Sequence, residues 1–317
     1  MVCSLELKNQ PGKIIKTKEK RKMVIKKKTT KHVVGHIINS IKKWQLSAYN
    51  GVTYPLVNGV VFSNEGSKDR EPLFDASNSG TKDIFAYWLD EDKGIIEISA
   101  PKPGYEIKAP KSMELFFSGT VFFFGGTCNH YIQFLDVSHL DVSNTTDFSA
   151  CFKYFGNGML GGKIVGLKKW DVSHEIHFSR MFAESFSANN IVDLDLSGWQ
   201  FSENKFVDVW GMFNSFAISA KRVNLNLDDW QTLQFYNLSH MFENFAAEAK
   251  VVNIIGIDNW TVNYANNFSS MFRNFAPKSK CCLDLSSWNK EYKQLSAYHD
   301  WFANGTFFRI KEPEWAD

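Results

Sequence analysis

The chain has 317 residues, of which 44% are hydrophobic, and it carries a formal net charge of +2. A chain of this length and composition can bury a substantial core, which excludes a protein that is disordered throughout. Its 28 Phe, 10 Trp and 10 Tyr indicate that large aromatic rings fill that core.

The first 31 residues are predicted to form a basic arm. Residues 1–43 contain 13 Lys and Arg against 2 Glu, a charge of +11, so the rest of the chain carries −9. Runs of like charge repel one another and resist burial, so residues 1–31 are predicted to be mobile. The arm is interpreted either as a solvated tail or as a contact for a polyanion. The basic residues that would make such a contact are Lys20, Arg21, Lys22, Lys26, Lys27 and Lys28.

Residues 32–110 are predicted to cap the end of a repeat stack. From Val34 to Trp44 apolar residues recur at spacings of three and four, which predicts a short amphipathic helix. A membrane-surface helix is the alternative interpretation. Apolar segments 84–89 and 95–99 flank an acidic, glycine-containing turn and predict a β-hairpin.

Two series of aromatic anchors share a period of about 30 residues. The first follows Leu140 and consists of tryptophans: Trp170, Trp199, Trp230, Trp260 and Trp288. The second consists of phenylalanines that mostly follow a Met: Phe152, Phe182, Phe213, Phe242, Phe272 and Phe302. Two series in phase predict a stack of about six repeats over residues 111–310, followed by a tail of residues 311–317.

The residues before each first anchor predict a strand. Positions five and three before the anchor are apolar in every unit and are expected to face the core. The position between them should face the opposite way, because side chains of a strand alternate. This position is Gly166 or Gly256 in two units, and in the other four it holds the candidate binding residues Asp136, Asp195, Asn226 and Asp284.

The residues around each second anchor predict a helix. An apolar residue lies four positions before each Phe, and a further Phe commonly follows three or four positions later, a spacing that places them on one helical face. Each unit is therefore predicted to be a strand, a turn and a short helix. The expected fold class is an α/β, leucine-rich-repeat-like solenoid with an N-terminal α+β cap.

No residue pattern indicates catalysis or a cofactor. The five cysteines are odd in number and lack the spacing of a disulfide framework or a zinc site, and the eight histidines form no ligand-spaced set. Phosphate-loop and nucleophile motifs are also missing. The chain is thus expected to be neither an enzyme nor a metal protein. It also shows no membrane span of ~20 apolar residues and no signal peptide, so a cytoplasmic location is the default expectation.

Several segments of the repeat are similar to those of a bacterial family. They include Leu194-Asp-Leu-Ser-Gly-Trp199, Trp170-Asp-Val-Ser173 and Phe178-Ser-Arg-Met-Phe182. They resemble the repeat of the BspA-like, leucine-rich-repeat-related surface proteins, also called the mycoplasma lipoprotein-type or DUF285 group, over roughly residues 84–310. The resemblance implies an adhesion or interaction module at the cell surface or secreted, without known catalysis.

These observations favour a non-catalytic scaffold that presents a protein-binding or adhesive surface to an unidentified protein or cell-surface ligand. One alternative is a binder of nucleic acid or another anionic polymer through the basic arm. A second alternative is a structural subunit of a phage or cell-surface assembly.

Overall fold

The computed structural model describes residues 35, 40–41, 56–66, 69–119, 132–158, 161–280, 282–288 and 309–311. All of them belong to residues 32–317, the second of the two units into which the chain divides. Some sequence predictions concern parts of the chain outside the described residues: Lys20, Arg21, Lys22, Lys26, Lys27 and Lys28 of the arm, most of the helix predicted from Val34, Phe302, and residues 312–317 of the tail.

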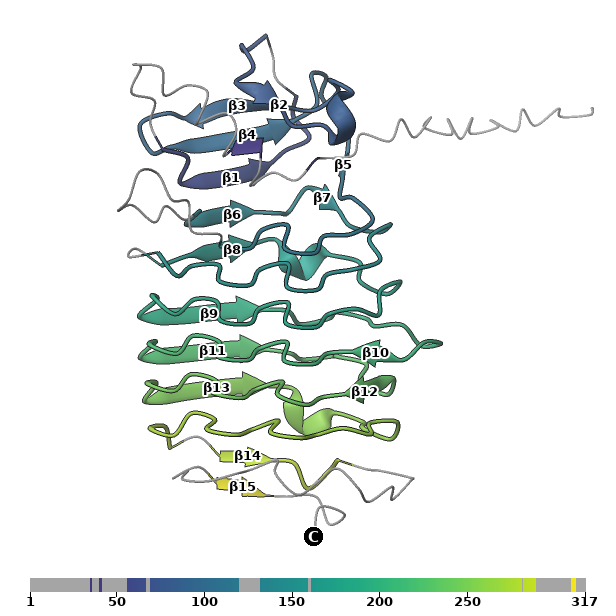
Figure 1. Ribbon diagram of the computed structural model, residues 1–317, viewed down its shortest axis with the longest axis vertical. Helices are drawn as coiled ribbons and strands as arrows, with labels where there is room; N and C mark the ends of the chain where they lie inside the picture. The colour runs from purple at the N-terminus through teal and green to yellow at the C-terminus, as the bar shows by residue number, and fades with distance from the viewer. Residues whose placement is uncertain are drawn as a thin grey trace, which may run out of the picture. The chain divides into compact units, whose positions relative to one another are not determined.

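The described chain is a β-solenoid in which each coil adds one short strand to the same side (Figure 1). Strands β9 (Ile191–Asp195), β11 (Arg222–Asn226) and β13 (Val251–Ile255) pair in parallel and in register. The coils that are described without a gap span residues 163–190, 191–221, 222–250 and 251–280. The repeat solenoid is therefore confirmed, with about four coils rather than the six predicted units.

A larger sheet joins the N-terminal region to the first coils. Its strand order is β2-β3-β4-β1-β6-β8, and β1 pairs in parallel with both β4 and β6. β3 and β4 form the antiparallel hairpin that the sequence predicts. The strands are β1 (Gly59–Phe62), β2 (Phe74–Asp75), β3 (Phe85–Asp90), β4 (Ile95–Ser99), β6 (Phe134–Asp136) and β8 (Lys163–Val165).

The remaining elements are short. Pairs β5–β7 and β10–β12 lie on a second side of the coils, and β14 pairs with β15. These strands are β5 (Ile107–Lys108), β7 (Leu140–Asp141), β10 (Val207–Asp208), β12 (Phe235–Asn237), β14 (Cys282–Asp284) and β15 (Arg309–Lys311). Three 3-10 helices complete the list: η1 (Asn78–Gly80), η2 (Leu167–Lys169) and η3 (Ile257–Asn259).

The Met-Phe segments form a ladder of turns, so the predicted helices and the α/β class are wrong. The N–H groups of Phe148 and Phe152 donate to carbonyls one coil further on, at 2.9 and 2.8 Å. Between them, the Cys151 N–H donates back to the Phe148 carbonyl at 3.1 Å. Tight turns of this kind bring residues three apart to one side as a helix does, so apolar spacing alone did not distinguish the two. The backbone hydrogen bonds to the next coil then favour the ladder of turns over a helix.

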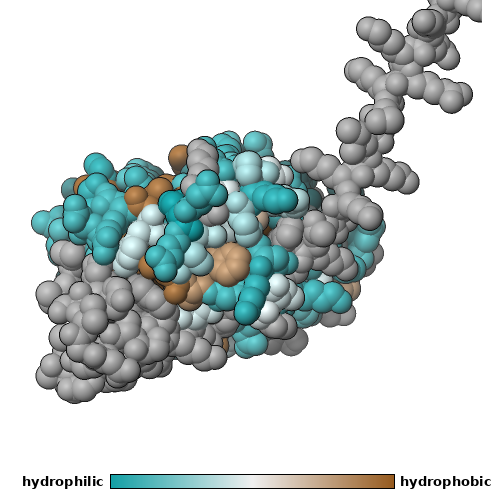
Figure 2. All heavy atoms as spheres, turned by 90° about the horizontal axis from the view of Figure 1, so that it is seen from above, coloured by the Kyte–Doolittle hydropathy of each residue, from teal (hydrophilic) through white to brown (hydrophobic). Residues whose placement is uncertain are grey.

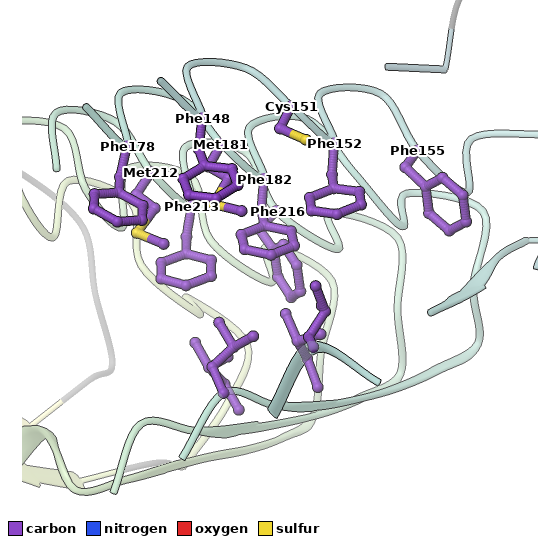
Figure 3. Packing of buried hydrophobic residues seen from close by; sticks show 14 of the residues in the cluster. Phe148, Cys151, Phe152, Phe155, Phe178, Met181, Phe182, Met212, Phe213 and Phe216 are labelled. Atoms are coloured by element: carbon purple, nitrogen blue, oxygen red, sulfur yellow. The ribbon is translucent and has the colours of Figure 1, made fainter. Parts of the chain in front are cut away.

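Aromatic rings of successive coils stack along the core (Figure 3). The ring centroids of Phe182 and Phe213 are 5.6 Å apart, with 4° between their planes. Trp230 lies between Trp199 at 6.1 Å and Trp260 at 5.8 Å, again nearly parallel. All the described anchors are buried. Each coil thus covers the rings of its neighbours.

Two strand residues face outward where the sequence predicted a core position. Sheet register places Val165 opposite Asp136 and Ile255 opposite Asn226. Ile255 is 52% exposed, and Ile254 packs against the core instead. These two coils have one extra residue between strand and Trp, which is accommodated by a glycine in the left-handed region before η2 or η3. The glycines are Gly166, with φ of 93°, and Gly256, with φ of 88°.

Strands β1 to β4 extend the larger sheet beyond the first coils at the N-terminal end of the stack (Figure 1). Seen from that end, hydrophilic side chains occupy much of the described surface and hydrophobic ones form small separate groups (Figure 2). Within the described residues, no helix is long and apolar enough to cross a membrane.

Candidate functional site

The four candidate binding residues of the strand side lie at the surface and close local turns. Asp195 accepts the N–H of Ser197 at 3.0 Å, and Asn226 accepts that of Asp228 at 3.1 Å. Such contacts define an Asx turn, in which the side chain replaces a backbone acceptor. Asp136 and Asp284 make the same contact with Ser138 and Ser286. The motif Asp-x-Ser therefore has a structural role here, and a binding role of these residues stays a prediction.

A second polar row on the strand side was not anticipated. The side-chain amide of Asn253 donates to the Oδ1 of Asn224 at 2.7 Å, and the Asn224 amide donates to Asp193. Asp193 and Asn224 lie two positions before Asp195 and Asn226, and Asn253 lies two positions before the outward-facing Ile255, so this row is on the same face. The signal in the sequence is a polar residue at the same place in three successive strands.

A cavity of about 140 Å³ lies on the turn ladder, and none of its lining residues is among the candidate binding residues predicted from the sequence. We call it the Arg180 pocket, and it is lined by Arg180, Trp210, Gly211, Asn214, His240 and Glu243.

The Arg180 pocket exists because one coil departs from the repeat. The residue two before Met is Ser in the other described coils, but here it is Trp210. The residue just before Met carries a side chain in those coils, Arg180 and His240 among them, but here it is Gly211. The missing side chain leaves a hollow between Arg180 and His240, and the indole of Trp210 borders it.

Glu243 fixes one wall of the Arg180 pocket. It is only 5% exposed, and both carboxylate oxygens are engaged. One pairs with Arg273, while the other accepts from the Asn214 amide at 3.0 Å and contacts His240 Nδ1 at 2.6 Å. Burial, with a smaller effect of the Arg273 charge, lowers the pKa of His240 below its usual value. The imidazole is therefore neutral at pH 7, with Nδ1 donating to Glu243 and Nε2 left as an acceptor.

Arg180 forms the opposite wall. Its Nη2 donates to Glu184 at 3.0 Å, and Lys153 shares the same carboxylate oxygen at 3.3 Å. The guanidinium carbon lies 5.5 Å from the centre of the Trp210 ring, within cation–π range. Within the described residues, Nε and Nη1 of Arg180 make no hydrogen bond. Arg180 thus presents two hydrogen-bond donors, Nε and Nη1, that can bind a group in the cavity.

An exposed aromatic group, which we call the Phe206 patch, includes a residue four positions before Trp210 of the Arg180 pocket. It consists of Phe206, Tyr236 and Tyr264, whose rings come from three successive coils. Phe206 is 57% exposed and its ring lies 6.1 Å from Tyr236 and 5.8 Å from Tyr264. Val207 and Val209 are buried, so Phe206 and Trp210 face the same way along the chain.

The sequence matches the family described as "Mycoplasma protein of unknown function, DUF285" over residues 111–253 and again over residues 219–315. The chain belongs to the DUF285 family. The predicted resemblance to DUF285 is thereby confirmed, while its leucine-rich-repeat and BspA-like parts stay predictions. No curated protein and no solved structure matches the chain.

Both the Arg180 pocket and the Phe206 patch fall inside the DUF285 matches. The two matches overlap over residues 219–253, as expected when the same motif recurs in successive coils. In the part of this DUF285 chain that the structure describes, no group of three or more His, Cys, Asp or Glu side chains is arranged to hold a metal ion. The lining of the Arg180 pocket includes a guanidinium, an indole and a neutral imidazole.

Proposed function

We propose that this DUF285 protein is a non-catalytic repeat scaffold that binds a protein partner on the side of the coils carrying the Phe206 patch and the Arg180 pocket. The observation that carries the proposal is Trp210, a half-buried indole where the other coils have Ser. The coils with Ser at this position form the same turns, so the indole is not required for the fold. Trp, Tyr and Arg also dominate the binding energy of protein interfaces, and all three occur here.

The hydrogen bonding of the Arg180 pocket gives Glu243 an orienting role rather than that of a general base. Both oxygens of Glu243 are engaged, and His240 is held by that carboxylate. A general base needs a lone pair directed at substrate and a pKa near the working pH. Glu243 has no unengaged oxygen, and it serves to orient its neighbours.

The proposal is tested by capturing partners with the intact chain at low salt. The test variant combines Trp210→Ser with Phe206→Ser, and Trp210→Ser restores the residue found in neighbouring coils. Its control is Ile191→Ser, which removes an exposed apolar side chain from the strand side. We expect a protein captured by the wild type and the control to be lost from the double variant. Equal capture by all three chains would refute this location of the binding surface.

A second candidate function rests on charge. Residues 1–43 carry +11, which supports binding of nucleic acid or another polyanion through the arm. This binding would be independent of the coil surface, so the double variant should leave it unchanged.

A further inference from the structure

We infer that the Arg180 pocket receives an acidic side chain of a protein partner, and that an apolar residue of the same partner segment packs on the Phe206 patch. The inference rests on the proposed function and specifies the chemistry of the partner.

The unengaged donors of Arg180 favour an anion in the Arg180 pocket. The charges around the pocket balance: Lys153 and Arg180 lie beside Glu184, Arg273 pairs with Glu243, and the carboxylate of Asp208 accepts the Trp210 N–H at 3.0 Å. The guanidinium of Arg180 lines the cavity, and within the described residues its Nε and Nη1 make no hydrogen bond. A guanidinium binds a planar carboxylate through two parallel hydrogen bonds, which gives both affinity and orientation.

The size of the pocket points to one side chain of a larger partner. Its volume of about 140 Å³ is smaller than the ~300–1,000 Å³ of typical small-molecule sites. A single carboxylate held there would gain little affinity alone, so the partner must make further contacts. The Phe206 patch provides them, since Phe206 and Trp210 are four residues apart, or about 13 Å in an extended chain. An extended partner with its acidic and apolar residues about four positions apart would reach both.

The alternative interpretation is that these side chains only hold the coils together. The neighbouring coils argue against it, because they stack with Ser in place of Trp210. The Arg180–Glu184 pair is also partly exposed, and pairs of this kind contribute little to stability.

The test starts from a phage-displayed library of random linear peptides selected on the immobilised intact chain. We expect enriched peptides to carry Asp or Glu about four positions from an aromatic or aliphatic residue. Affinity of one such peptide is then measured by fluorescence anisotropy against the wild type and Arg180→Gln. The matched control is Arg222→Gln, which removes an exposed guanidinium from the strand side. We expect at least about tenfold weaker binding for Arg180→Gln and no change for the control, since one lost charge-assisted pair is worth that much.

A second variant fills the pocket and leaves Arg180 in place. At Gly211 an added Cβ would lie 3.5 Å from Arg180 Cγ and 3.6 Å from Asn214 Cβ, which are ordinary contacts. Its φ of 55° is matched by Arg180 and His240, both at 57°, so a side chain is compatible with this backbone. Gly211→Gln should therefore lower the melting temperature by only about 2–4 °C, the effect of left-handed strain without a clash, and abolish peptide binding.

The possible failures can be told apart. Peptides without an acidic residue, equal binding by Arg180→Gln, or a library that yields no acidic binder would each overturn the inference. Binding of a sialylated glycan in place of peptides, lost in Arg180→Gln, would also overturn it in favour of an acidic sugar. If the captured partner is lost in the Trp210→Ser, Phe206→Ser variant but retained by Arg180→Gln, the proposed function stands and only the acidic contact is wrong.

Discussion

At the scale of single residues, four of the five tryptophan anchors link their coil to the preceding one in two ways, and the exception is Trp260, whose buried Nε1–H has no hydrogen-bond partner within the described residues. The Trp230 ring stacks on its neighbours, and its Nε1–H donates to the Leu196 carbonyl at 2.7 Å. Trp199 and Trp288 make the same bond to Leu167 and Ile257, at 2.9 and 2.7 Å. A buried carbonyl is thereby satisfied at the place where the strand ends. This explains why the repeat uses Trp rather than Phe at the first anchor.

The double role of Trp230 leads to a prediction with two variants. Trp230→Ala should lower the free energy of unfolding by about 3–5 kcal/mol, because it empties a buried aromatic site. Trp230→Phe keeps a ring in the stack but leaves the Leu196 carbonyl without its donor, and should cost about 1–3 kcal/mol. Urea denaturation measures both values. A loss below 1 kcal/mol for the Ala variant would contradict the burial of this ring.

Glu175 is expected to make stability depend on pH. It is 1% exposed, and its Oε2 makes no hydrogen bond, while Oε1 accepts the N–H groups of Ile176 and His177. Burial raises its pKa above the usual 4.5. The folded chain then holds this proton more strongly than the unfolded chain, so the contribution is most favourable below pH 4.5 and is lost as pH rises through the folded pKa.

Replacing Glu175 by Gln isolates that effect. Relative to the wild type, Glu175→Gln should gain stability as the pH is raised from 4 to 7, since its amide cannot become charged. The measurement is the difference in unfolding free energy between the two proteins at each pH. A difference that stays constant over this range would show that the carboxyl group is not desolvated in the fold.

At the scale of elements, the turn ladder uses left-handed residues at a regular place in each coil. Ala150, Arg180, Gly211, His240 and Ser270 all precede the Met or Cys of the second anchor and have φ between 51° and 57°. Left-handed residues cost roughly 1–2 kcal/mol when they are not glycine. The bonds of these residues to the next coil, such as Arg180 to Trp210 at 2.8 Å, offset that cost.

The left-handed glycines before the Trp anchors provide the element-scale prediction. A Cβ on Gly256 would lie 2.6 Å from Asp228 Cα and 2.7 Å from Asp228 N, both backbone atoms of the preceding coil. Gly198 has a similar φ of 77°, but a Cβ there meets nothing within 4 Å. Gly198→Ala should therefore cost about 1 kcal/mol of conformational strain. Gly256→Ala should cost about 1–3 kcal/mol more, because the coils must separate. Thermal denaturation of the pair checks this, and equal losses would disprove the close approach.

The sequence predicts the strands better than the turns, for a physical reason. Alternating apolar residues define a strand directly, so Leu194 and Leu225 were placed correctly in the core. The sequence does not reveal the one-residue shift of the strand before Gly256, because two successive residues there are apolar and alternation does not show which of them faces the core. The Arg180 pocket depends on which residues of different coils become neighbours, and this requires the stacking itself. Its signals in the sequence are Trp210, which interrupts the series of Ser residues, and Gly211, which stands where the other described coils have a side chain.

At the scale of the whole molecule, the described core is continuous from coil to coil. Phe117, Phe152 and Phe182 stack in sequence, with centroids 5.4 and 5.1 Å apart, and Phe213, Phe242 and Phe272 extend the series at 5.6, 5.5 and 5.5 Å. Each coil thus contacts mainly its two neighbours, as in other repeat proteins. The charge is distributed differently, since residues 1–43 carry +11 and the rest of the chain carries −9.

The arm and the coils should therefore be separable in stability and in binding. Deleting residues 1–31 should leave the melting temperature nearly unchanged, because so charged a segment contributes little apolar burial. Any affinity of the intact chain for single- or double-stranded DNA should disappear with the deletion and should fall steeply between 50 and 200 mM salt, because binding releases counterions. Calorimetry and filter binding measure the two effects on the same pair of proteins.

A large drop in melting temperature would mean that the arm is part of the folded structure. DNA binding that persists without the arm, or that ignores salt, would assign it to the coil surface, where the Trp210→Ser, Phe206→Ser variant then decides whether DNA and the protein partner share one site.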